Sequence, residues 1–450
     1  MKNCIKKSKL KLSLFFLGML AFSCKDRKFN KTETKNTDVE DSSFGKNESK
    51  IDFDMSKGQF EIPAVTENQL QICSYNIQFL GSSLKRDSTF IADALKNCDI
   101  VVVQELVAFP YRYVYPESLS WEEFKKPTDP SRDIDDGDSE SARFFAAMKK
   151  NNFAYTLSSE NTGAAQFHAS STGNEWWVTF FKLDKIKVAA DLPKGFLEER
   201  RFNSSNFDRV PWALPLRIRK TGADFTLISV HLHFTSKPKD KEEDRKKIVT
   251  QGRISDFSEL TQGEVDRLLR LTELEQIFSW IEKNKKYTDS DSINHTEKDY
   301  IVLGDMNISG ANEVAEIMKV VPNVRTLNPS AEIMTNSQGN EAYDHVIVSN
   351  DSNFKFPEKF KVLNMACRAA LLGAPEFDPE SKKPPEQSSA NLKPKNTQCA
   401  QFEKAEGRQN FPILKLLDES SKGFWNEFRY RYSDHNPVFF TLDIPEKDED

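Results

Sequence analysis

The chain has 450 residues, enough for one large domain or two ordinary ones. Its 38% hydrophobic residues can supply a core, and its 29% charged residues with only 17 glycines exclude fibrous and low-complexity classes. The formal net charge is −6, and loss of the first 23 residues, with five lysines and no acid, would leave −11. Because phosphate contacts need lysine and arginine, a nucleic-acid substrate would require a local basic rim or bound cations.

The N-terminus has the layout of a signal peptide. Five lysines lie between Lys2 and Lys11, and the apolar run from Leu12 to Phe22 is too short to span a bilayer. Cys24 follows a stretch similar to a lipoprotein box, in which the cysteine is acylated; the alternative is an ordinary signal peptide with a chance cysteine. We expect residues 1–23 to be removed, 24–68 to be a lipidated flexible tether, and the domain to stand outside the cytoplasm, on an outer-membrane or cell-surface lipoprotein.

Export would place the remaining cysteines in an oxidising compartment. With Cys4 removed and Cys24 acylated, four cysteines remain, and three pairings among them are possible: Cys73, Cys98, Cys367 and Cys399. No Cys-x-x-Cys motif occurs, which argues against a zinc cluster or a thioredoxin-like centre.

Strand and helix patterns alternate from residue 70 onward. In chain order, strands are predicted at 70–76, 99–103, 176–183, 214–218, 225–230, 300–303, 345–348 and 438–442. Helical spacing of apolar residues covers 90–95 and 265–282. Most strands are apolar on both faces, which predicts an α/β layered domain over residues 69–445. Polar stretches near 109–140, 235–262 and 366–423 interrupt the pattern and are interpreted as insertions.

Acidic, amide and histidine residues stand at or just past the ends of these strands, where an α/β enzyme collects its reactive groups. They are Asn76, Glu105, His231, Asp305, Asn307, Asp344, Asp434 and His435. Carboxylates and amides can hold a hard cation or position water, and histidines can move protons near neutral pH. Each motif alone is common in turns and caps, but their joint appearance, each tied to a strand, indicates one hydrolytic site.

These motifs resemble the endonuclease/exonuclease/phosphatase family, and within it deoxyribonuclease I most. The stretches that carry the resemblance span residues 70–442: Tyr75-Asn76-Ile77-Gln78, Gln104-Glu105, Gly304-Asp305-Met306-Asn307, Ala342-Tyr343-Asp344 and Ser433-Asp434-His435-Asn436-Pro437. The resemblance implies a four-layer α/β sandwich of two packed, mainly antiparallel or mixed β-sheets flanked by helices. It also implies hydrolysis of phosphodiester bonds with Mg²⁺, or with Ca²⁺ or Mn²⁺ instead.

The same resemblance assigns a role to each matching residue. Glu105, Asp434 and Asn76 would serve the metal, and Asn76 and Arg209 would bind phosphate. Asp305 with Asn307 would position phosphate and nucleophile. Asp344 would orient His435, and Glu175 would orient the second catalytic histidine, His231. By contrast, His233 and His345 are expected to face away from the site, and Trp176-Trp177 is expected to pack in the core.

Some positions depart from deoxyribonuclease I. Gln78 and Val107 stand where that enzyme places arginines in the DNA minor groove, and Glu341 stands in place of a cysteine. These changes weaken the prediction that the chain binds duplex DNA in the minor groove.

We expect a nuclease acting on DNA and anchored to a membrane through its lipid, with no protein partner implied. The alternatives are a sphingomyelinase-like or other small phosphodiester or phosphomonoester hydrolase of the family, and a binding lipoprotein that has lost activity.

The N-terminal pattern predicts incorporation of a fatty-acid analogue into the expressed full-length protein. The Cys24→Ala variant should lose the label, because the acylated thiol is absent. Labelling would be measured on the immunoprecipitated protein. A Cys24→Ala protein that still incorporates the analogue would refute the lipid anchor.

Overall fold

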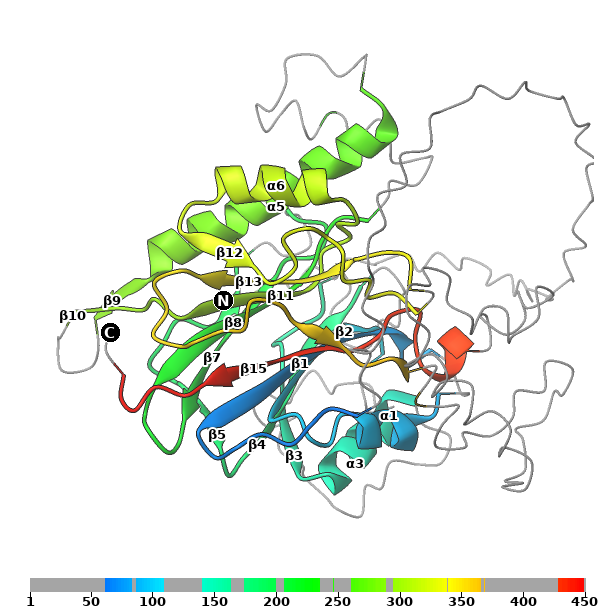
Figure 1. The fold of residues 1–450 in the computed structure, drawn as a ribbon, viewed down its shortest axis with the longest axis vertical. Helices are drawn as coiled ribbons and strands as arrows, with labels where there is room; N and C mark the ends of the chain where they lie inside the picture. The colour runs from blue at the N-terminus through cyan, green and yellow to red at the C-terminus, as the bar shows by residue number, and fades with distance from the viewer. Residues whose placement is uncertain are drawn as a thin grey trace, which may run out of the picture. The chain divides into compact units, whose positions relative to one another are not determined.

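Two β-sheets packed face to face form the centre of the computed structural model (Figure 1). The structure describes residues 61–82, 86–108, 140–162, 174–199, 206–234, 246, 260–288, 294–337, 339–365, 368 and 428–448, all within the unit Ile51–Asp450. The expected signal peptide, nearly all of the expected tether and most of the three expected insertions lie outside these residues. Among the helices that the structure describes, none combines the length and apolar character needed to cross a membrane.

The first sheet has six strands in the order β14-β15-β1-β2-β4-β3. Their bounds are β1 Gln69–Leu80, β2 Ile100–Leu106, β3 Phe153–Leu157, β4 Trp176–Lys182, β14 Lys361–Val362 and β15 Val438–Asp443. β1 and β2 run parallel, and every other neighbouring pair in this sheet is antiparallel. The sheet is therefore mixed, as the sequence predicted.

The second sheet has seven strands, in the order β12-β13-β11-β8-β7-β5 with β6 paired to β7. Their bounds are β5 Ile186–Val188, β6 Gly195–Phe196, β7 Trp212–Ile218, β8 Asp224–His231, β11 Tyr300–Asp305, β12 Val324–Thr326 and β13 Asp344–Ser349. β8 and β11 are parallel and the other pairs antiparallel. A separate two-stranded sheet joins β9 Lys286–Thr288 and β10 Asn294–Thr296.

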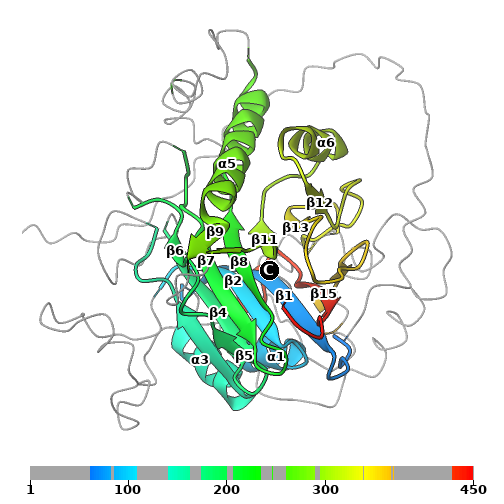
Figure 2. The same cartoon turned by 90° about the vertical axis from the view of Figure 1, so that its left-hand side faces the viewer.

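Helices cover the outer face of each sheet (Figure 2). α1 Ser88–Ala94 and α3 Glu140–Lys150 lie on the first sheet, and α5 Gln262–Asn284 and α6 Ala311–Val320 lie on the second. α1 begins at Asp87, whose carboxylate accepts from the Phe90 amide, and α5 begins with a capping box between Thr261 and Glu264. The predicted four-layer α/β sandwich is confirmed.

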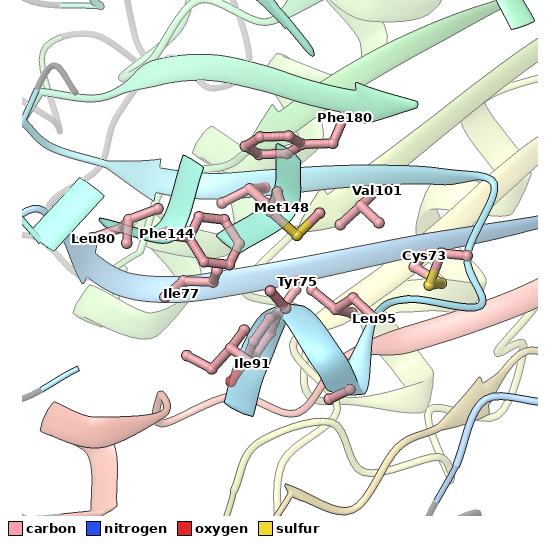
Figure 3. Close-up of a cluster of buried hydrophobic side chains, with 14 of the residues drawn as sticks. Cys73, Tyr75, Ile77, Leu80, Ile91, Leu95, Val101, Phe144, Met148 and Phe180 are labelled. Atoms are coloured by element: carbon pink, nitrogen blue, oxygen red, sulfur yellow. A yellow bond between two sulfur atoms is a disulfide. The ribbon is translucent and has the colours of Figure 1, made fainter. Parts of the chain in front are cut away.

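Three apolar cores separate the four layers, because the central strands bury both faces. Along β1, Ile72 points into the core between the sheets, whereas Tyr75 and Ile77 pack against the helices α1 and α3. Figure 3 shows Tyr75 beside Ile91 of α1, with Phe144 of α3 nearby. The neighbouring Trp176 and Trp177 divide in the same way between the two cores, so their predicted place in the core is confirmed.

A disulfide joins Cys73 of β1 to Cys98, just before β2. Both cysteines are completely buried within the core between the first sheet and its helices. This pairing is one of those that the sequence left open. Cys367 and Cys399 lie outside the described residues.

His233 attaches the end of β8 to α5. Its Nδ1 contacts Asp208 Oδ2, its Nε2 lies 3.0 Å from Asp266 Oδ1, and its backbone amide donates to Glu273 at 2.6 Å. Burial alone would lower the pKa of His233, but the hydrogen bonds to Asp208 and Asp266 raise it to about 10. The ring is therefore a structural cation, which agrees with the expectation that it faces away from the reactive residues.

Gly304 marks a close approach between strands. Its φ is +142°, and a Cβ there would lie 2.1 Å from the Val230 carbonyl oxygen of β8 and 3.2 Å from Gln104 Nε2 of β2. Gly304→Ala should therefore lower the free energy of unfolding by at least about 2 kcal/mol, through clash and backbone strain. The measurement is urea unfolding at neutral pH.

Gly263, in the first turn of α5, is the matched control, because a Cβ there would meet no atom within 4 Å. Gly263→Ala should leave stability unchanged or raise it by up to about 1 kcal/mol. Equal effects of the two substitutions would contradict the close approach at Gly304.

The raised pKa of His233 predicts a loss of stability at alkaline pH. A folded-state pKa of about 10, against 6.5 for the free side chain, gives stability that is complete below pH 6.5 and is lost as the pH rises toward 10. The stability difference between the protein and His233→Gln should shrink by up to about 4 kcal/mol from pH 6.5 to 9.5, as measured by urea unfolding.

His345 provides the control for this prediction. It is also buried, but burial lowers its pKa, so its titration lies below the alkaline window. His345→Gln should therefore leave the alkaline slope unchanged. Parallel slopes for the protein and His233→Gln would show that His233 is not the group involved.

Candidate active site

The two parallel strand pairs bring their carboxyl ends to one edge of the sandwich. Asn76 lies in β1 opposite Gln104 of β2, and Glu105 follows directly. In the other sheet, His231 ends β8 and Asp305 ends β11, and these two residues are paired in the register. Asn76 Nδ2 donates to Asp305 Oδ2 at 2.9 Å, so the edges of the two sheets meet at this point.

The antiparallel neighbours begin at the edge where these parallel strands end. Glu175 immediately precedes β4, and Asp344 is the first residue of β13. Arg209 lies three residues before β7, and His435 lies three residues before β15. The directions of the strands therefore bring residues that lie between positions 76 and 435 to one edge of the sandwich.

The Asn76 amide bridges two carboxylates, the half-buried Glu105 of the first sheet and the buried Asp305 of the second. Its Nδ2 donates to Glu105 Oε1 and to Asp305 Oδ2, both at 2.9 Å. Its Oδ1 is buried and has no hydrogen-bond partner within the described residues. A buried acceptor of this kind is uncommon in proteins and is expected to serve a bound group.

Two histidines face the same carboxylate oxygen. His435 Nδ1 lies 2.7 Å from Asp344 Oδ2, and its Nε2 lies 3.4 Å from Asp305 Oδ2. His231 Nδ1 lies 3.0 Å from Glu175 Oε1, and its Nε2 lies 3.7 Å from Asp305 Oδ2. Each ring is thus held by a carboxylate at one nitrogen and directs the other nitrogen toward Asp305, as a proton carrier requires.

The charges of this group support one another. Burial alone would lower the pKa of His435, but Asp344 and Asp305 raise it well above its ordinary value. Burial and Arg209 would lower the pKa of His231, and the carboxylates of Glu175 and Asp305 raise it overall. In return, His435 and His231 overcome the effect of burial and lower the pKa of Asp305. The arrangement favours an ionised Asp305 beside two imidazole rings that bind a proton more readily than a free histidine does.

The backbone is strained at three residues of the site. Phe79, Glu105 and Asn307 have φ values of 52°, 61° and 53°, which non-glycine residues rarely adopt. Hydrogen bonds hold these conformations: Glu105 N donates to Glu175 Oε2 at 2.6 Å, Phe79 N to Glu105 Oε2 at 3.0 Å, and Asn307 N to Asp305 Oδ1 at 2.9 Å. Such strain costs about 1–3 kcal/mol per residue and is common where side chains are held for function.

Glu105, His231 and Asp305 could hold a metal ion. Each offers one ligand atom, and the three atoms lie within 4.8 Å of one another. Burial raises the pKa of Glu105, which means that its charged form lacks full compensation. Together with the unpartnered Asn76 Oδ1, these oxygens fit a hard divalent cation such as Mg²⁺.

Asp434 is not part of this group, although the resemblance places it among the ligands. Its Oδ2 accepts from Gln78 Nε2 at 2.6 Å, and its charge contributes to raising the pKa of Glu105. Asp434 therefore lies near the group without joining it, and its role as a ligand stays a prediction.

Arg209 and Asn307 are engaged by protein groups. Arg209 Nε lies 3.3 Å from Glu175 Oε1, and its Nη1 lies 3.4 Å from each of the carbonyl oxygens of His231 and Leu232. Asn307 Nδ2 donates to the Leu232 carbonyl at 3.0 Å. The structure brings both residues to the site, and their contact with phosphate stays a prediction.

Sequence reasoning assigned no role to the Ser433 hydroxyl. It donates to the Asn76 carbonyl at 2.6 Å and accepts from the amides of Gln78 and His435, both at 3.1 Å. The motif Ser433-Asp434-His435 was visible in the sequence, but the contacts of Ser433 with Asn76 and Gln78 span more than 350 residues. His345, by contrast, directs Nε2 to the Ile308 carbonyl at 2.8 Å and turns away from the site, as expected.

No family model matches the chain, and no curated protein matches it. Similar solved structures include an endonuclease/exonuclease/phosphatase family protein from Bacteroides thetaiotaomicron, at 12% identity and a TM-score of 0.42, covering 84% of this chain and 98% of that one. The mannosyl-6-phosphatase of the same organism shares 12% identity at a TM-score of 0.40, covering 83% and 99%. D. rerio TDP2 complexed with a single-strand DNA product shares 11% identity at a TM-score of 0.38, covering 83% and 98%.

With identities and scores this low, the fold assignment rests on the strand order of this chain itself. That order gives two mixed sheets of six and seven strands with helices outside both. This architecture is the one that the resemblance to the endonuclease/exonuclease/phosphatase family implies, and the roles that the resemblance gives to the residues at its edge stay predictions.

Proposed function

We propose that the chain hydrolyses phosphodiester bonds with the help of a divalent cation and acts as a nuclease on DNA. The observation that carries the proposal is the pair of histidines, His231 and His435, each held at Nδ1 by a carboxylate and directing Nε2 toward Asp305. Hydrolysis needs one group to take a proton from water and another to give a proton to the leaving oxygen. Two such rings beside one reacting position supply both functions.

The carboxylates behind the rings set their orientation. Because Asp344 and Glu175 hold the Nδ1 atoms, proton exchange with substrate and water takes place at Nε2. The raised pKa values of His435 and His231 keep a proton available near neutral pH. Asn76 and Arg209 would donate to the phosphate oxygens.

Glu105 and Asp305, with the Asn76 amide oxygen and Asp434, would hold the cation, which is Mg²⁺ or, in its place, Ca²⁺ or Mn²⁺. The bound cation would offset negative charge on the phosphate group. The raised pKa of Glu105 supports this role, since a carboxylate whose charged form is disfavoured by burial gains most from a neighbouring positive charge.

A small phosphodiester or phosphomonoester, including a sphingomyelinase-like substrate, is the second candidate. Gln78, which replaces a groove-binding arginine in the resemblance, has its amide bound to Asp434. Arg209 is paired with Glu175. A small phosphate ester would need no groove contacts from these positions.

We also propose that the chain is an exported lipoprotein, anchored through Cys24. The buried disulfide between Cys73 and Cys98 supports this proposal, because such bonds persist in oxidising compartments outside the cytoplasm.

The function is tested with the chain from residue 26 onward on plasmid DNA, RNA, sphingomyelin and bis(p-nitrophenyl) phosphate, each with Mg²⁺, Mn²⁺ or Ca²⁺. We expect plasmid DNA to be cleaved with Mg²⁺ and cleavage to stop with chelator. His231→Ala and His435→Ala should each lower turnover at least ~100-fold through loss of a proton carrier. Turnover confined to small esters would support the second candidate instead.

His345→Gln is the matched control, because this buried histidine adjoins Asp344 but its ring faces the Ile308 carbonyl. After correction for the folded fraction, it should keep the rate of the parent chain. A near-parental rate for either His231→Ala or His435→Ala at saturating metal would disprove the assigned roles.

A further inference from the structure

A buried arginine outside the catalytic set, Arg86, contacts three segments of the chain. The Arg86 side chain is 1% exposed and pairs through Nε with Glu140, whose side chain is 0% exposed. Its Nη1 donates to the carbonyl oxygens of Arg429 at 2.9 Å and Tyr432 at 2.8 Å, and its Nη2 donates to the Gln78 carbonyl. One guanidinium thus satisfies three backbone carbonyls and one carboxylate.

Two of these segments lead directly to reactive residues. Gln78 stands two residues after Asn76 in β1, and the Tyr432 carbonyl immediately precedes Ser433-Asp434-His435. The backbone adds a further contact, since the amide of Asp87 donates to the Arg431 carbonyl at 3.0 Å. Arg86 therefore fixes the residues before His435 against the end of β1.

Ser433 and the Gln78 side chain add further hydrogen bonds between the same two segments. Gln78 N donates to the Ser433 hydroxyl, and the hydroxyl donates to the Asn76 carbonyl. The Gln78 side chain donates to Asp434. The segment that carries Asp434 and His435 is thus held to β1 both by the Ser433 and Gln78 contacts and by the Arg86 contacts.

Stability alone is a weak reason for this arrangement. Removing two charges from water costs about as much as their attraction returns, so buried ion pairs are often replaced by apolar residues without loss. The geometry instead uses what arginine alone provides, five donors in a rigid plane that can reach several acceptors at once. A buried arginine of this kind adds little net stability, but its fixed geometry sets the positions of the backbone segments that it contacts.

We propose that Arg86 is a positioning residue for the reaction, which sets where His435 and Asp434 stand relative to Asn76 and Asp305. It acts through the carbonyls of Gln78, Arg429 and Tyr432 and touches no reacting atom. The inference rests on the proposed function, in which His435 carries a proton.

The test compares Arg86→Lys and Arg86→Gln with the parent chain from residue 26. We expect kcat for bis(p-nitrophenyl) phosphate with Mg²⁺ to fall ~10- to 100-fold, because small misplacements of a catalytic group have effects of this size, while KM changes by less than about twofold. In protein labelled with ¹⁵N-histidine, the Nδ1 signal of His435, assigned through His435→Asn, should shift because its contact with Asp344 changes.

Arg217 offers a matched control. It pairs with Asp191 and Asp224 at the other end of β7 and β8, so it is a partly buried, doubly paired arginine remote from the site. Arg217→Lys should lower stability but leave kcat and the His435 signal unchanged. If Arg86→Gln does not fold, Arg86→Lys, which keeps the charge opposite Glu140, decides the outcome.

The two readouts separate this inference from the proposed function. An unshifted His435 signal in a folded Arg86 variant, or an equal loss of kcat in Arg217→Lys, would overturn the positioning role. A shifted signal in a chain that turns over none of the substrates would uphold the positioning role and count against the proposed function.

Discussion

The active-site edge depends on two carboxylates, one half-buried and one buried, held close together where the two sheets meet. Glu105 comes from the first sheet and Asp305 from the second, and the amide of Asn76 donates to both. Their mutual repulsion in a buried site has to be offset, and the surrounding groups do so in part. Nε2 of His231 and of His435 faces Asp305, whereas Glu105 keeps a raised pKa. The negative charge of Glu105 is thus not fully balanced by the surrounding groups, and this imbalance suits the site to a cation.

The topology explains why these groups meet. Each sheet contains one parallel pair, β1 with β2 and β8 with β11, and all other neighbours are antiparallel. The parallel strands end where their antiparallel neighbours begin, so eight reactive positions fall on one edge. The close approach at Gly304, where β11 passes near Val230 and Gln104, brings the two edges together. The directions of the strands therefore determine which residues meet at the site.

Strand ends could be read from the sequence, and contacts across the fold could not. The apolar runs at 99–103, 225–230 and 300–303 predicted central strands, and Glu105, His231 and Asp305, one or two residues after these runs, were predicted site positions. Short edge strands such as β5 and β14 lack enough alternation to be recognised. The role of Arg86 could not be predicted, because three of its four partners are backbone carbonyls, one of them 346 residues away, and a carbonyl carries no residue-type signal. The Gln78–Asp434 hydrogen bond could not be predicted for a related reason, since its two residues lie 356 positions apart and nothing in the sequence pairs them.

In the proposed function, the charge balance would also constrain how a phosphate substrate and a cation bind. A phosphate entering this edge would approach Glu105, Asp305 and Asp434, while Arg209 is engaged by Glu175. Without a cation, the anion gains from the histidines and Asn76 but is opposed by these carboxylates. A cation bound between the carboxylates would reverse that opposition, and a bound phosphate would in turn supply the cation with further oxygen ligands. The two affinities are therefore coupled, and thermodynamic linkage requires that each strengthen the other by the same factor.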